Sequence, residues 1–205
     1  WESVTVPGTV GGWAEVSRKF GKLPFETLFE VAIKYAHDGF PVSPVIAHLW
    51  AKGAIELKAQ PGFAQNFLQR GKAPDAGEVY TNPALAKTYE RIAETAGTAF
   101  YQGDLADRIE DFARQHDAAL RVFDLANFKP EWCKTLKNDF ANFDLHEIPP
   151  NGQGIAALIA LGILKNTSIH DIGADDPKAL HFQIEAMKLA LRDAEHYVAD
   201  LKYMS

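Results

Sequence analysis

The chain has 205 residues, of which 47% are hydrophobic and 23% are charged, and its formal net charge is −6 at pH 7. This composition is typical of a globular protein, and the acidic balance argues against a nucleic acid partner, because nucleic-acid domains gather Lys and Arg on one face. No run approaches the ~20 continuous apolar residues of a membrane span, and no positively charged start leads into an apolar leader, so we expect neither a span nor a targeting address.

The first part of the chain is predicted to be mostly helical. Residues 2–6 alternate as a short strand, which Pro7-Gly8 ends. Apolar periodicity and boundary residues then predict helices over residues 9–20, 24–38, 45–57, 82–97 and 105–113. Between them, residues 99–103 should form a short turn, and residues 71–82, rich in Gly, Pro, Asp and Asn, should form the longest irregular loop.

The predicted helix over residues 9–20 combines an apolar stripe with two adjacent glycines. The stripe consists of Val10, Trp13, Val16 and Phe20. Gly11 and Gly12 each cost roughly 1 kcal/mol relative to alanine inside a helix. We therefore expect close packing against a neighbouring element to require small residues at both positions.

The rest of the chain is predicted to contain a strand pair and two long helices. Residues 122–128 form a helical connector, and residues 132–136 and 143–148 a pair of strands. A helix over residues 155–164 is apolar nearly all round and should be buried. After a loop over residues 166–176, the last helix runs from Lys178 to about Leu201. Its apolar side carries Leu180, Ile184, Met187, Leu191 and Val198.

The turn over residues 149–154 allows two interpretations. Pro149 and Pro150 end a strand, and Gly152 and Gly154 permit a sharp turn into the following helix, which is usually an architectural role. The same residues match the G-x-G-x-x-A pattern of a dinucleotide fingerprint. Two features weigh against a nucleotide: the strand alternates and ends in prolines, and the repeated strand-helix-strand pattern of a dinucleotide fold is absent.

Other reactive residue types give weak signals. The single cysteine, Cys133, excludes an internal disulfide, and its strand-like surroundings predict a half-buried packing role. In the last helix His181 and Glu185, and also Asp193 and His196, share a face, but a metal site in a bundle needs such pairs from several helices. We expect no metal site and no cofactor.

Seven segments, taken in order, resemble the gamma-glutamyltransferase (gamma-glutamyltranspeptidase) family over nearly the whole chain. They are VTVPGTVGGW at 4–13, FGKLPFETL at 20–28, AIKYAHDGFPV at 32–42, NPALA at 82–86, AFYQG at 99–103, FDLA at 123–126 and EIPPNGQG at 147–154. The last is close to a variant found in bacterial-like members. The structural residues of these motifs are Pro7, Gly8, Gly12, Gly39, Gly103, Pro149, Pro150, Gly152 and Gly154.

The resemblance implies a fold and an activity. The chain is similar to the carboxyl-terminal part of the large subunit, so we expect one mainly α domain over residues 1–205, irregular and multi-helical, with about three short strands. It would be a portion of an N-terminal-nucleophile hydrolase αββα assembly. Members cut their own precursor before a threonine, whose hydroxyl then attacks a gamma-glutamyl amide, with the freed α-amine as base and backbone donors holding the oxyanion. The acyl group passes to water, an amino acid or a peptide.

The catalytic residues of the family have no counterpart in this sequence. The family nucleophile stands in a Thr-Thr-His/Tyr context, which none of the threonines shares: Thr5, Thr9, Thr27, Thr81, Thr88, Thr95, Thr98, Thr135 and Thr167. The arginine that pairs with the substrate carboxylate is also missing. We therefore assign no catalytic or substrate-binding residue and expect the 205-residue chain alone to be inactive.

The expected partners are the small catalytic subunit of the same precursor and a small gamma-glutamyl substrate. Severed from that subunit, the chain should self-associate through exposed surface, beginning near Trp1 at the edge of the predicted first strand. A related amide acylase, a nucleotide-binding module and a helical interaction domain remain alternatives. The compartment is left open between cytoplasm and periplasm.

Overall fold

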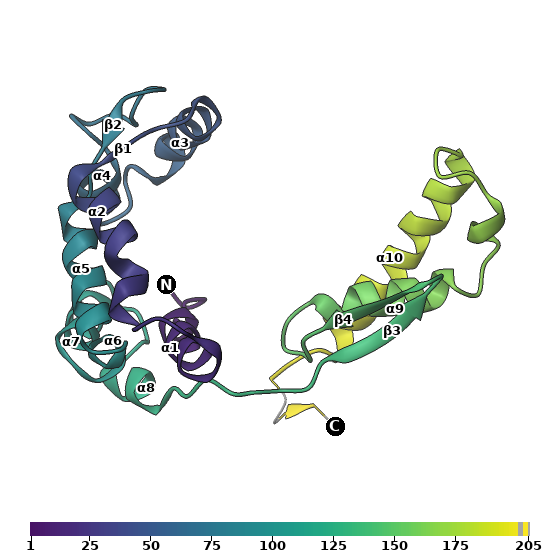
Figure 1. Ribbon diagram of the computed structural model, residues 1–205. Coiled ribbons are helices and arrows are strands. Elements are labelled where there is room, and N and C mark those ends of the chain that lie inside the picture. Colours follow the sequence, from purple (N-terminus) through teal and green to yellow (C-terminus); the bar gives the residue numbers. More distant parts are fainter. Residues whose placement is uncertain (201–202, 205) are drawn as a thin grey trace. The chain divides into compact units, whose positions relative to one another are not determined.

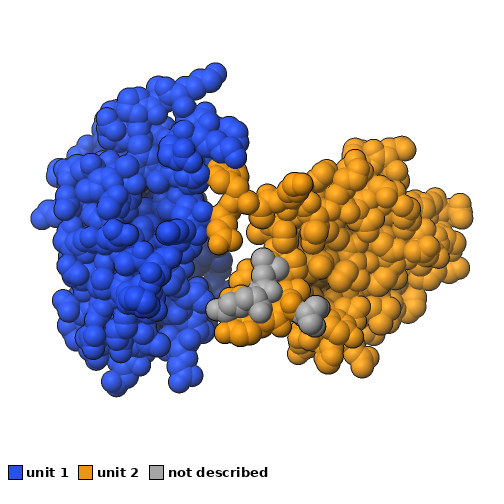
Figure 2. Space-filling model, turned by 90° about the horizontal axis from the view of Figure 1, so that it is seen from below, with its two compact units in different colours: residues 1–130 blue, residues 131–205 orange. Residues whose placement is uncertain are grey.

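The structure, a computed structural model, describes residues 1–200 and 203–204 and contains two compact units, Trp1–Pro130 and Glu131–Ser205 (Figure 2). Both units are dominated by helices with short strands (Figure 1), which confirms the mainly α fold class. The expectation of a single domain concerns how the two units associate, and it stays a prediction.

The first unit is an irregular cluster of helices (Figure 1). Its elements in chain order are α1 (Thr9–Phe20), the 3₁₀ helix η1 (Glu26–Phe29), α2 (Glu30–Asp38), β1 (Phe40–Pro41), α3 (Pro44–Leu57), α4 (Phe63–Phe67), β2 (Val79–Tyr80), α5 (Pro83–Glu94), α6 (Thr98–Gln102), α7 (Asp104–Gln115) and α8 (Val122–Asn127). The main core gathers Val10, Phe29, Ile92 and Leu125 from four of these helices. A smaller cluster forms where β1 pairs with β2 antiparallel, around Val42 and Tyr80.

The second unit is built around one apolar helix. Its elements are β3 (Leu136–Phe140), β4 (Phe143–Glu147), α9 (Gly154–Leu164), the 3₁₀ helix η2 (Ile169–Asp171) and α10 (Pro177–Tyr197). The antiparallel β3–β4 hairpin and α10 both pack against α9 (Figure 1). No residue of α9 is exposed, so the burial predicted from its apolar composition is confirmed.

Capping residues explain why three helices begin where the sequence predicted. The side chains of Ser43, Asn82 and Asp176 each accept a hydrogen bond from a backbone amide in the first turn of α3, α5 and α10. A proline follows each cap at the first helical position, where its missing N–H costs nothing. The bounds of α1 and the position of β4 also match the prediction.

Several sequence predictions are wrong at the level of single elements. Residues 2–6 form no strand, because no partner strand lies beside them; a turn closes instead, with the Val4 amide donating to the Trp1 carbonyl. Residues 99–103 are not a turn but α6, capped by Gly97 at φ +84°. The predicted helix over 24–38 is a 3₁₀ turn followed by α2. The strands β1 and β2 were missed, because each has only two residues.

The first strand of the hairpin lies later than predicted. It spans Leu136–Phe140, which overlaps the predicted strand only at Leu136 and otherwise lies between the two predicted strands. Residues 132–135 are therefore not a strand, and Cys133 is exposed rather than half-buried. The cause is Asn138, which faces α9 and donates from Nδ2 to the Leu158 carbonyl at 2.8 Å. A polar residue on the inner face hides the alternation by which a strand is recognised.

The last helix turns a different side inward from the one predicted. α10 buries Ala179, Ala186 and Ala190, of which the last two belong to the cluster on α9. The larger residues predicted as its apolar side are exposed: Leu180, Ile184, Met187 and Leu191. The helix ends at Tyr197, and the predicted end at Leu201 lies outside the described residues.

Candidate functional site

The glycine-rich segment leading into α1 packs directly against an aromatic ring. A Cβ atom added to Gly8 would lie 2.9 Å from Cζ of Phe128, and one added to Gly11 would lie 2.9 Å from Cε1 of the same ring. Such contacts are too short for any side chain to be accommodated without movement. The close packing predicted from the glycine pair is therefore confirmed at Gly11, whereas Gly12 has open space around it.

Tyr101 ties that segment to the rest of the unit. Its hydroxyl donates to the Pro7 carbonyl at 2.8 Å and accepts from the Gly11 amide at 2.9 Å. Its ring stacks on Phe128 with centroids 5.2 Å apart, and burial raises the pKa of the phenol. Because the hydroxyl proton is committed to Pro7, Tyr101 serves as a structural tie rather than as an acid or base.

The third contributor, α8, presents Phe128 at its C-terminal end. The Asp124 carboxylate accepts from the Arg121 amide at 2.9 Å, which caps the helix, and the Glu110 carboxylate accepts from the Val122 amide at 2.6 Å. These bonds fix α8 against α7. Segments 4–13 and 99–103 thus meet at Phe128, two residues after the FDLA segment, so the structure brings three of the seven family motifs together.

A groove of about 520 Å³ lies beside Tyr101. Apolar side chains dominate it, including Leu23, Phe25 and Phe128, while Arg18 and Glu15 form an exposed ion pair at 2.6 Å. The Glu15 carboxylate raises the pKa of Arg18, which stays cationic. This surface can hold an apolar body with a polar end, but its lining offers no activated nucleophile.

Gly39 connects α2 to the short sheet. Its φ of +91° favours glycine, and a Cβ there would lie 2.9 Å from the Tyr80 carbonyl. Gly103, between α6 and α7, has an ordinary extended backbone and is required by close packing alone, because an added Cβ would lie 3.0 Å from Cα of Ala99. Both glycines are architectural.

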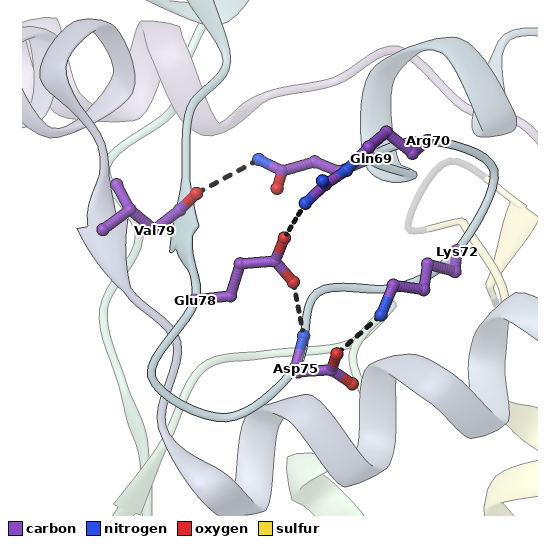
Figure 3. Close-up of polar contacts among 6 residues, drawn as sticks. All are labelled: Gln69, Arg70, Lys72, Asp75, Glu78 and Val79. Atoms are coloured by element: carbon purple, nitrogen blue, oxygen red, sulfur yellow. Dashed lines mark hydrogen bonds and ion pairs between the residues drawn. The ribbon is translucent and has the colours of Figure 1, made fainter.

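The loop before β2 is ordered by ion pairs (Figure 3). The Glu78 carboxylate accepts from the Arg70 guanidinium at 2.8 Å and from the Asp75 amide at 2.9 Å. Lys72 pairs with Asp75 at 2.6 Å. These contacts hold the strand that Gly39 packs against, so the loop supports a motif glycine.

In the second unit the Pro-Pro turn leads into α9. Pro150 is buried, and a Cβ on Gly154 would overlap the Glu147 carboxylate, whose Cδ would lie 2.8 Å away. A carboxylate therefore occupies the approach to the helix start, where a dinucleotide would need to place its pyrophosphate. The strand before the turn belongs to an antiparallel hairpin instead of a parallel sheet, so the geometry disfavours the dinucleotide alternative.

The remaining candidates do not assemble into a site. Glu185 pairs with Lys188 at 2.8 Å, which lowers its pKa, and within residues 1–200 and 203–204 no three His, Cys, Asp or Glu side chains gather as a metal would require. Sequence reasoning missed one hydroxyl–imidazole pair, Thr135 Oγ1 and His146 Nδ1 at 2.9 Å. Both residues are exposed, and only the strand pairing could have revealed them.

Comparison with known proteins assigns the family. The profile described as Gamma-glutamyltranspeptidase matches residues 1–205, so the chain belongs to the gamma-glutamyltranspeptidase family. It is 33% identical to the glutathione hydrolase-like YwrD proenzyme of Bacillus subtilis (strain 168) over 97% of this chain and 38% of that protein. It is 35% identical to the oxamate amidohydrolase proenzyme of Klebsiella pneumoniae over 98% of this chain and 39% of that protein.

Solved structures agree with that assignment. A cephalosporin acylase from Bacillus halodurans superposes with a TM-score of 0.92 at 41% identity, over 98% of this chain and 38% of that one. Helicobacter pylori gamma-glutamyltranspeptidase also gives 0.92, at 25% identity, over 100% of this chain and 59% of that one. The chain thus spans between about two fifths and three fifths of the length of these relatives. Among the described residues, no helix is long and apolar enough to cross a bilayer.

Proposed function

We propose that this chain is the carboxyl-terminal part of the large subunit of a self-processing enzyme that hydrolyses or transfers gamma-glutamyl amides. The match of the family profile along all 205 residues carries this proposal. Support also comes from the meeting of three family motifs at Tyr101 and Phe128, which indicates that the scaffold of the family is retained.

In this proposal the chain is a structural part of the large subunit, and the residues that react with the substrate lie on other parts of the enzyme. The nucleophile is the N-terminal threonine of a small subunit cut from the same precursor, which is the expected partner. Its α-amine acts as base because the reference pKa of about 7.7 to 8.0 lies near the working pH. No residue of this chain is assigned to the reacting atoms.

A related amide acylase is the second candidate. It is favoured by a specific observation: identity is 41% to the cephalosporin acylase structure but 25% to the gamma-glutamyltranspeptidase structure. The two candidates share the self-processing threonine mechanism and differ in the acyl group accepted.

Turnover of a gamma-glutamyl anilide tests the proposal. We expect release of the aniline by the full-length gene product and none by the purified 205-residue chain. Release by the 205-residue chain would contradict the assignment of the nucleophile. If the processed full-length enzyme cleaves a cephalosporin side-chain amide but not the anilide, the protein is the related amide acylase and not a gamma-glutamyl enzyme.

A further inference from the structure

The first observation is a set of large apolar side chains that the helices of the first unit leave exposed, on α1 above all. Contiguous exposed apolar surface marks contact sites in soluble proteins.

In the first unit, part of this surface forms a groove of about 670 Å³ between α1 and η1, here called the α1 groove. Phe29 forms its floor and meets Trp13 edge to face at 6.0 Å between ring centroids. Along its walls Trp13 is 45% exposed, Val16 52%, Phe20 64% and Leu28 51%. The apolar stripe predicted for this helix thus continues from buried Val10 into an open groove.

The second observation is Gly12, which lines the α1 groove. Gly8 and Gly11 are explained by Phe128, but a Cβ on Gly12 meets nothing within 4 Å. A glycine inside a helix is destabilising relative to alanine, so its presence at this position needs a physical reason. Close approach of another backbone or side chain to α1 is such a reason, and among the described residues no atom makes it.

We infer that the α1 groove is filled, in the complete protein, by an apolar segment of the same family polypeptide lying outside residues 1–205, which packs against α1 at Gly12. This inference rests on the proposed function, because relatives carry further chain beyond the 38% or 39% matched here. A second copy of the chain and residues 131–205 are the alternative occupants, and the labelling experiment below separates them from a segment outside the chain.

Two glycine substitutions test the inference. Gly12→Ala and Gly53→Ala are matched, because Gly53 also lies inside a helix, α3, with nothing within 4 Å of an added Cβ, but away from the groove. In the 205-residue chain we expect each to raise the melting temperature by roughly 2–4 °C through helix propensity. In the full-length product Gly53→Ala should keep this gain, whereas Gly12→Ala should lower the melting temperature by several degrees through overpacking.

Oxidative labelling of Trp13 gives a second readout that is independent of turnover. At a concentration where both are monomeric, Trp13 should react at least tenfold more slowly in the full-length product than in the 205-residue chain. If the full-length protein proves inactive but Trp13 is protected, the inference stands and the proposed function fails. Equal labelling of Trp13 in the active full-length enzyme and in the 205-residue chain overturns the inference. Protection of Trp13 in the monomeric 205-residue chain also overturns it, as does a lower melting temperature of Gly12→Ala in that chain. Protection that appears only on dimerisation would assign the groove to a second copy.

Discussion

At the residue scale, the hydroxyl of Tyr101 connects two parts of the chain that lie about ninety positions apart. It satisfies the Pro7 carbonyl and the Gly11 amide at once; both bonds are partly buried, and the ring that carries the hydroxyl stacks on Phe128. The sequence could not reveal this link, since a tyrosine in AFYQG is as readily explained by packing. It could only indicate, through the glycines, that something lies close to α1.

Tyr101→Phe should therefore destabilise the first unit while leaving the aromatic stacking intact. Removing the hydroxyl leaves a backbone donor and a backbone acceptor unsatisfied, which costs about 1–3 kcal/mol. Urea unfolding of the 205-residue chain, with hydrogen exchange at the Gly11 amide, measures the loss. Tyr35→Phe is the control, because Tyr35 is 55% exposed and should change stability by less than about 0.5 kcal/mol. If both variants change the free energy of unfolding equally, the two hydrogen bonds of the Tyr101 hydroxyl do not stabilise the first unit as described.

At the scale of elements, the sequence predicted helix and strand boundaries best where neighbouring residues in the sequence alone determine them. Helix starts at Ser43, Asn82 and Asp176 depend on a cap followed by proline, and all three were predicted. The position of β3 depends on Asn138 bonding to a helix that lies later in the chain, and the exposed side of α10 depends on which face α9 selects. Tertiary partners set these features, so local patterns could not fix them.

The loop before β2 makes a prediction about pH. The hydrogen bond from the Asp75 amide, aided by the Arg70 guanidinium, holds the pKa of Glu78 below its ordinary 4.5, and Lys72 lowers the pKa of Asp75 in the same way (Figure 3). A carboxyl group whose folded pKa is depressed contributes stability above its unfolded pKa and loses it as pH falls through the folded value. The loop should hence be intact at neutral pH and should loosen only in acid, as the pH falls below the ordinary value of 4.5 for a glutamate and through the lowered pKa of Glu78.

Hydrogen exchange at the Asp75 amide between pH 2 and pH 6, corrected for intrinsic exchange, measures this loosening. Protection should fall with the titration of Glu78, and Glu78→Gln should abolish the pH step because its side chain does not titrate. Glu78 titrating at or above the ordinary value would contradict the arrangement of the loop.

At the scale of the whole molecule, apolar side chains are exposed in both units. Phe20 is 64% exposed in the first unit and Leu180 57% in the second. Residues 2–6 form no strand, so the strand edge expected at Trp1 is absent, and the Trp1 ring packs on Phe112 and His116. Association near Trp1 stays a prediction. The apolar helix faces are the better candidates for contact.

The purified 205-residue chain should self-associate as its concentration rises, because burying these faces removes apolar surface from water. Light scattering coupled to size exclusion should show the mass rising above 22.6 kDa. Added salt should strengthen the association by screening repulsion between chains of net charge −6. A monomer at every concentration, or dissociation by salt, would count against association through apolar faces.

The most direct test of the account is the intact mass of the full-length gene product, with N-terminal sequencing, after incubation at neutral pH. The account predicts two chains, the smaller beginning with threonine and the larger containing the sequence described here. A single uncut chain would contradict it and would favour a helical interaction protein built on the same fold.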